Sequence, residues 1–197
     1  MSAVAHARWP GGWCPQARRV DSPNFGPRPP DTQVTLALIH SISLPPGVYC
    51  GDAIERLFTN RLDWDAHPYF NQIRGAEVSA HFLIRRDGEC VQFVAAHERA
   101  WHAGRSNWRG RDNVNDFSLG IELEGLEGDR FEPAQYERLA TLLEAARAAL
   151  PSLSEVVGHE HVAPGRKQDP GPGFDWSLLA QRLIHSGLGT FPSPGGA

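Results

Sequence analysis

The stretch "VTLALIHSI" (residues 34–42) decides the fold, because it is almost entirely apolar and rich in β-branched residues. This pattern predicts a strand buried on both faces, inside a sheet that other elements cover on each side. Side chains two residues apart point to the same face, so His40 should share a face with Leu38. Leu36 and Val34 continue that face toward the start of the strand. Taken alone, a histidine at such a position is more often a hydrogen-bonded structural residue than a functional one.

Two further segments predict strands. "SAHFLIRRDGECVQFV" (79–94) consists of two apolar runs around Asp87-Gly88, which is a strong hairpin signal. "SLGIELEG" (118–125) predicts another strand, in which Ile121 and Leu123 face the core.

Three segments predict helices. Asp52 can cap a short helix in which apolar residues at 54, 57 and 58 share one face. From Pro133, leucines and alanines recur at helical spacing until Pro151 stops the pattern. "FDWSLLAQRLIHSGLG" (174–189) predicts a last helix that ends at a glycine.

Strands and helices that alternate around a hairpin predict an α/β fold with a mixed central β-sheet flanked by helices. The 197 residues, of which 41% are hydrophobic and 21% charged, suit a single domain with one sizeable core. An irregular lead-in is expected over about residues 1–31, which are rich in proline and glycine. We expect a disordered tail over about residues 190–197.

Composition also restricts the partners. The net charge is −4 and no run of like charge is present, so nucleic acid and anionic membrane surfaces are poor partners. The first 20 residues lack the unbroken apolar core of a secretory signal. Cys14, Cys50 and Cys90 lack C-x-x-C spacing and are expected to be reduced. We therefore expect a cytoplasmic monomer without nucleic-acid or membrane partners.

Candidate metal ligands gather in "GHEHVAPGRKQDPGPGFDW" (158–176). If this stretch is extended, His159 and His161 face the same side, and Asp169 and Lys167 are again two residues apart. A histidine from the first strand, with a histidine and the aspartate from this stretch, would give a three-ligand zinc site with one open position, as in catalytic zinc centres. The alternative is that these are solvated loop residues.

Two glutamates on one strand are candidates for proton transfer. Glu122 and Glu124 share a face of "SLGIELEG", and such a pair is commonly the solvated side of a strand. A zinc-bound water, however, needs a carboxylate nearby to take its proton. Either glutamate is a candidate for that general base.

Several segments together resemble a known family. "HSISLPPG", "AHPYF", "VSAHFLIRRDGECVQFV", "RAWHAGRSNW", "NDFSLGIELEG" and "GHEHVAPGRKQDPGPGFDW" are similar, in this order, to the signature segments of the type 2 N-acetylmuramoyl-L-alanine amidases. The resemblance covers roughly residues 18–180. It implies the fold shared by phage lysozyme-like amidases and peptidoglycan recognition proteins, a mixed sheet flanked by helices.

The resemblance also implies residue roles. The zinc ligands would be His40, His159 and Asp169. The general base would be Glu122, and Lys167 would stabilise the oxyanion, while Tyr69 in "AHPYF" matches a tyrosine near the metal. His161 would then be a bystander.

The implied activity is zinc-dependent hydrolysis of the amide bond between N-acetylmuramic acid, in its 1,6-anhydro form, and L-alanine of muropeptides, within cytoplasmic cell-wall recycling. Two alternatives stay open: a non-catalytic module of the same fold that binds peptidoglycan fragments, and an amidase that acts on intact murein. Ser41, Glu77 and Asn113 depart from residues common in the family, which bears on substrate contacts rather than on the metal.

One loop is a candidate for substrate binding. "WHAGRSNWRGRDN" (101–113) interleaves tryptophans with arginines, which suits an aromatic face on a sugar and guanidinium groups on peptide carboxylates. The candidates are Trp101, Arg105, Arg109 and Arg111. The alternative is that Trp101 and His102 pack under the site while the arginines are solvated.

Overall fold

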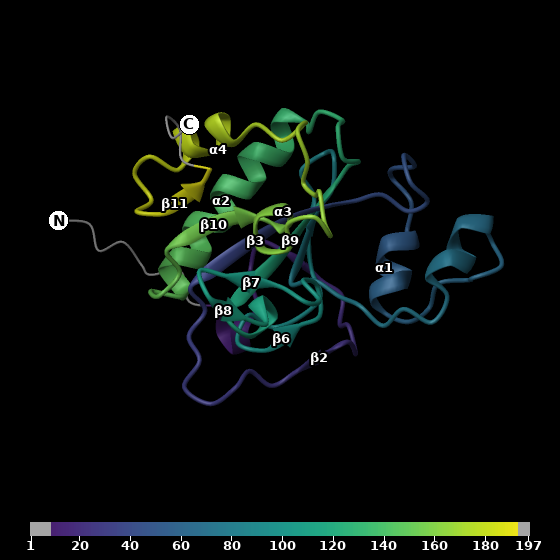
Figure 1. Ribbon diagram of the computed structural model, residues 1–197, viewed down its shortest axis with the longest axis horizontal. Coiled ribbons are helices and arrows are strands. Elements are labelled where there is room, and N and C mark those ends of the chain that lie inside the picture. Colours follow the sequence, from purple (N-terminus) through teal and green to yellow (C-terminus); the bar gives the residue numbers. More distant parts are fainter. Residues whose placement is uncertain (1–8, 193–197) are drawn as a thin grey trace.

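A computed structural model describes residues 9–192, and its centre is a seven-stranded mixed sheet (Figure 1). The strand order is β1-β5-β4-β9-β3-β10-β11. The bounds are β1 Arg18–Arg19, β3 Leu36–Ile42, β4 Phe82–Ile84, β5 Cys90–Gln92, β9 Ser118–Glu124, β10 Glu155–Gly158 and β11 Gly189–Phe191. Neighbouring strands are parallel except β4 and β5, which form the predicted antiparallel hairpin. The predicted mixed sheet is confirmed.

The two longest strands, β3 and β9, lie next to each other in the middle of the sheet. Their apolar side chains are buried on both faces, as the continuous apolar pattern predicted. They pair in parallel from Leu36 with Ser118 to Ile42 with Glu124. In this register His40 is the partner of Glu122.

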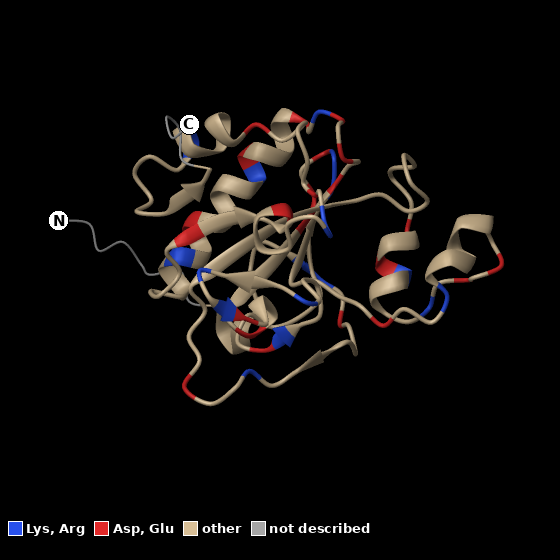
Figure 2. Ribbon diagram, in the orientation of Figure 1, with Lys and Arg blue, Asp and Glu red and all other residues tan. Residues whose placement is uncertain are grey.

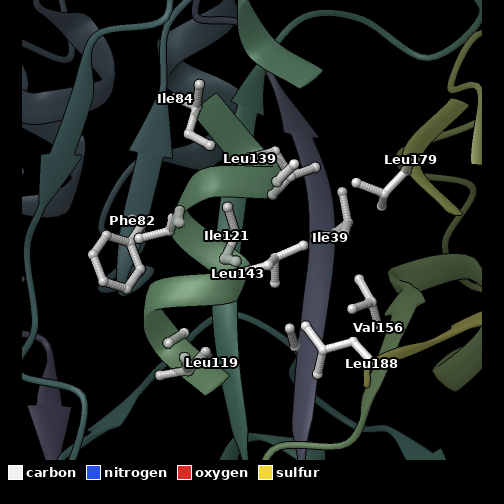
Figure 3. Packing of buried hydrophobic residues seen from close by; sticks show 14 of the residues in the cluster. Ile39, Phe82, Ile84, Leu119, Ile121, Leu139, Leu143, Val156, Leu179 and Leu188 are labelled. Carbon is white, nitrogen blue, oxygen red and sulfur yellow. The ribbon is translucent and has the colours of Figure 1, made fainter. Parts of the chain in front are cut away.

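Helix α2 (Pro133–Ala149) covers one face of the sheet, together with α4 (Trp176–Arg182). Pro133 occupies the first turn, and the Glu132 backbone N–H donates to the Gln135 side chain, 2.9 Å away, in a capping box. Figure 3 shows Leu139 and Leu143 of this helix against Ile39 and Ile121 of the sheet. This face is the main apolar core.

The opposite face has two smaller apolar clusters. One lies under α1 (Ala53–Phe58) and the 3-10 helix η2 (Pro68–Ile73), and the other lies under the segment from Ala103 to Phe117. The remaining short elements are η1 Pro10–Gly12, β2 Phe25–Gly26, β6 Arg99–Ala100, β7 Asn107–Trp108, β8 Arg111–Asp112, η3 Val114–Asp116 and α3 His159–Val162. The candidate functional residues lie on this face.

The structure corrects several boundaries. The first strand begins at Leu36, so Val34 lies outside it and packs with the α2 cluster instead of sharing a face with His40. The last helix ends at Arg182 rather than at a glycine. The predicted tail is wrong for residues 190–191, because β11 pairs with β10 there, whereas residues 193–197 lie outside the described range. The lead-in is largely irregular where it is described, and residues 1–8 lie outside it.

Charged residues of both signs are interspersed along the chain (Figure 2). This agrees with the small net charge of −4. Within residues 9–192, no helix combines the length and the apolar character that crossing a membrane requires.

Candidate metal centre and active site

Three buried side chains meet where β3 approaches its carboxyl end. The Nδ1 atoms of His40 and His159 are 3.0 Å apart, and Oδ2 of Asp169 is 2.9 Å from the first and 3.0 Å from the second. The exposed fractions of these residues are 2%, 1% and 5%. The sequence placed these three residues in one site, and the structure brings them together as a possible metal site.

Strand pairing explains how distant residues reach this point. β10 runs parallel to β3 with Gly158 beside Ile39, so the next residue, His159, emerges next to His40. The backbone N–H of Glu160 donates to the Asp169 carbonyl, 2.9 Å away, and fixes the aspartate against α3. The glycines that follow allow close packing: a Cβ on Gly173 would lie 1.8 Å from the carbonyl oxygen of Asp129.

The other nitrogen of each imidazole is already engaged. Nε2 of His159 lies 3.0 Å from the backbone carbonyl oxygen of Ala103, and Nε2 of His40 lies 3.0 Å from Nδ1 of His102. A carbonyl oxygen only accepts, so Nε2 of His159 carries the proton and its Nδ1 presents a lone pair to Asp169. An acceptor nitrogen and a carboxylate oxygen at this distance repel each other unless a proton or a metal ion lies between them.

The donor set fits zinc. Two imidazole nitrogens and one carboxylate oxygen are common zinc ligands, and three protein ligands leave a position for water. The three ligand atoms lie 2.9–3.0 Å from one another, close enough for a single ion to bind all of them. Burial lowers the pKa of His40 to about 4, although Asp169 acts in the opposite direction. The low pKa keeps the imidazole neutral and able to bind a metal.

His161 does not join the cluster. The stretch after Gly158 is not extended as the two-residue spacing suggested, because His159–Val162 forms the short helix α3. Nδ1 of His161 accepts the backbone N–H of Gly158 at 2.9 Å, and its ring packs edge-on against Phe191. The extended interpretation was wrong for this reason.

Glu122 lies beside the cluster on the neighbouring strand. It is 9% exposed, and its Oε2 is buried without a hydrogen-bond partner among the described residues. Burial, and then the charge of Asp169, raises the pKa of Glu122 well above its usual range, while Lys167 lowers it. A buried carboxylate with a free oxygen beside a candidate metal site suits proton transfer.

Glu124 occupies a different environment. It is 1% exposed, and its carboxylate accepts the backbone N–H of Cys50 at 2.9 Å and pairs with Arg85 at 3.2 Å. Neither glutamate is therefore on a solvated strand face, and the alternative that both are is wrong. Glu124 anchors a loop, which leaves Glu122 as the carboxylate available for chemistry.

Lys167 and Tyr69 differ in their relation to the site. Lys167 is exposed on the loop before Asp169, and its charge acts on His40 and Glu122, lowering the pKa of both groups. Tyr69 is half-buried in η2 and packs against the cluster under α1. Its proposed role stays a prediction.

The candidate substrate residues occupy separate places. Arg109 pairs with Glu155 at 2.7 Å, at the start of β10, and Arg111 lies over the ring of Phe117. Arg105 lines an open pocket of about 260 Å³ together with Arg166 and Val162. Trp101 is half-buried next to His102. Substrate contact by the tryptophan and the arginines stays a prediction.

Sequence reasoning missed the contact between His102 and His40. It considered His102 only as a residue that packs under the site. The available signal was the glycine at position 120, which lies on the same face of the strand as Glu122. A glycine there leaves room for a ring, and in the structure a Cβ on Gly120 would lie 2.4 Å from the His102 ring.

Comparison with known proteins identifies the family of the chain. A family model described as N-acetylmuramoyl-L-alanine amidase matches residues 30–172, which include all three candidate ligands. The chain belongs to this amidase family. It is 51% identical over 166 residues, 84% of this chain and 89% of the relative, to the 1,6-anhydro-N-acetylmuramyl-L-alanine amidase AmpD of Salmonella typhimurium (strain SL1344).

Solved structures of amidases share the fold of this chain. A crystal structure of a selenomethionine derivative of AmpD has a TM-score of 0.85 and 48% identity, covering 87% of this chain and 97% of that one. The amidase AmiD of E. coli, solved with anhydro-N-acetylmuramic acid-L-Ala-D-γ-Glu-L-Lys as substrate, has a TM-score of 0.55 and 29% identity, covering 79% and 60%.

Replacing Asp169 with alanine should abolish stoichiometric zinc binding by this amidase, because two neutral imidazoles alone make a weak site. His161→Ala is the matched control, since His161 is two residues from a ligand but turned away from it. Metal analysis after dialysis should find about one zinc per chain in the control and only traces in the Asp169 variant. Equal zinc content in the two variants would contradict the assigned ligand set.

Replacing Glu122 with glutamine should stabilise the metal-free amidase more as pH rises. The folded-state pKa of Glu122 lies above the value of about 4.3 expected in an unfolded chain. As pH rises between these values, the unfolded chain releases the proton first, so wild-type stability falls, and glutamine lacks this effect. Thermal melts with chelator from pH 4.5 to 8.5 should show a growing advantage of the variant. A constant difference would show that Glu122 does not titrate in this way.

Proposed function

We propose that this protein is a zinc-dependent amidase that hydrolyses the bond between 1,6-anhydro-N-acetylmuramic acid and L-alanine in muropeptides. The observation that carries the proposal is the convergence of His40, His159 and Asp169 beside Glu122, whose Oε2 has no partner among the described residues. The names of the AmpD relatives and the ligand of the AmiD complex support this substrate class.

Zinc bound by the three ligands would supply a Lewis acid that acidifies a water molecule and polarises the amide carbonyl. Glu122 then takes the proton of the attacking water on its free Oε2. The raised pKa of Glu122 suits this step, because a carboxylate of higher pKa is a stronger base toward the water proton. The same carboxyl group gives the proton to the leaving amine of L-alanine.

Lys167 supplies positive charge beside the developing oxyanion. It lies on the loop that also carries Asp169, and its charge lowers the pKa of both His40 and Glu122. A positive charge close to the reacting carbonyl stabilises the negative charge of a tetrahedral intermediate. The stiff loop holds this lysine relative to the metal ligands.

The remaining assignments belong to the same proposal. Trp101 and Arg105 flank the His102–Ala103 segment, which contacts both candidate histidine ligands. We therefore assign these two residues to substrate binding. The three free cysteines and the balanced charge suit a monomer in the reducing cytoplasm, where small muropeptides would be its substrate in cell-wall recycling.

The test is cleavage of anhydro-muramyl-tripeptide, followed by mass spectrometry, with enzyme as purified, after chelation and after zinc is restored. Free tripeptide should appear, vanish with the metal and return with zinc. Glu122→Gln should keep its zinc and lose about 10²–10⁴ in rate. Zinc-loaded protein that binds the muropeptide without cleaving it would instead indicate a binding module, and cleavage only of intact murein would change the substrate.

Lys167→Met should keep zinc and lose about 10²–10³ in kcat, because it removes the charge and keeps much of the chain length. Lys167→Arg is the matched control, since it restores the charge and should recover part of the rate. Steady-state kinetics and zinc content measured on the same preparations give the result. Full turnover by the methionine variant would remove Lys167 from the mechanism.

A further inference from the structure

The His102–Ala103 segment contacts both histidines of the metal site at the ring edge opposite Asp169. Nδ1 of His102 is 3.0 Å from Nε2 of His40, and the two rings meet edge to face with centroids 5.1 Å apart. The carbonyl oxygen of Ala103 lies 3.0 Å from Nε2 of His159. The proposed chemistry uses neither residue, so their role needs a separate explanation.

The direction of the hydrogen bonds at His102 follows from Ser118. The Ser118 hydroxyl donates to the carbonyl of Val114 at 2.7 Å, so its oxygen is free to accept from Nε2 of His102, 3.3 Å away. With its proton on Nε2, a neutral His102 has a lone pair on Nδ1. Nε2 of His40 must then be the donor, which leaves Nδ1 of His40 without a proton and facing Asp169.

Two further residues hold His102 in this position. Oδ1 of Asn115, a buried side chain, accepts the backbone N–H of His102 at 3.2 Å and that of Ala103 at 2.8 Å. The His102 ring lies against Gly120, where any Cβ would come within 2.4 Å of it. One face of β9 therefore presents Ser118, Gly120 and Glu122 in turn, at alternate positions.

We propose that His102 is a positioning residue for the metal: it accepts the Nε2 proton of His40, and so keeps Nδ1 of His40 unprotonated and directed at the ion. Ser118 sets the tautomer of His102, and Gly120 gives its ring room. This inference rests on the proposed function only in that the ion is zinc. Outer partners of metal-bound histidines typically contribute about 10–100-fold to metal affinity.

The first test needs no variant. Long-range ¹H–¹⁵N correlation spectra of the metal-free wild-type protein distinguish the two neutral tautomers of histidine. The His40 and His102 rings should both carry their proton on Nε2. A proton on Nδ1 of His40 would overturn the proposal.

The second test compares two substitutions at one position. His102→Phe keeps a ring against Gly120 but has no acceptor, and should lose about 10–100-fold in zinc affinity. His102→Asn places an amide oxygen close to the position of Nδ1, and should keep most of the affinity. Chelator competition gives the affinities, and the same spectra should show mixed His40 tautomers in the phenylalanine variant only. Wild-type affinity in the phenylalanine variant would overturn the proposal.

A further variant and the zinc affinity of the wild type distinguish failure of the His102 role from failure of the proposed function. If His102→Phe does not fold, Ser118→Ala replaces it, since it removes the acceptor that sets the His102 tautomer, and zinc affinity must then fall. If the wild-type protein binds no zinc, the proposed function fails. If the wild type and all the variants bind zinc equally, only the role of His102 fails.

Discussion

The parallel pairing of β3 with β9 sets the geometry of the whole site. It places His40 beside Glu122, so that a candidate metal ligand and a candidate proton acceptor are direct partners on neighbouring strands. Both strands are buried by the α2 cluster on their other face, which leaves them little freedom to shift. The arrangement carries a cost, because a buried carboxylate oxygen such as Oε2 of Glu122, which has no partner within residues 9–192, destabilises the fold. Such a cost is typical of residues kept for chemistry rather than for stability.

The two faces of the sheet differ in the kind of side chain that they carry. The face under α2 and α4 is filled with apolar side chains and provides most of the hydrophobic stabilisation. The other face is assembled from loops and short elements, and it carries several buried polar groups, among them His40 and both glutamates of β9. Loops position these groups well only when they are stiff, and close backbone packing at Gly173 is one source of that stiffness.

Local patterns in the sequence were enough for the main elements. The apolar runs predicted β3 and β9, the Asp-Gly pair predicted the β4–β5 hairpin, and Pro133 with its leucines predicted α2. Features that depend on distant contacts were not predictable in this way. Arg85, the partner of Glu124, lies 39 positions away next to the turn of the β4–β5 hairpin, and the contact of His40 with His102 spans 62 positions. Strand alternation wrongly placed His161 on the same side as His159, because residues 159–162 form a single turn of helix after Gly158.

The separation of the three ligands along the chain has a consequence for dynamics. His40 lies 119 positions from His159 and 129 from Asp169, so an ion held between them would act as a cross-link between the middle of the sheet and the C-terminal part of the chain. Its binding free energy would then count as folding free energy. The backbone around α3 would form a unit whose opening is governed by the ion, and amide exchange there would report the metal more directly than exchange under α2 does.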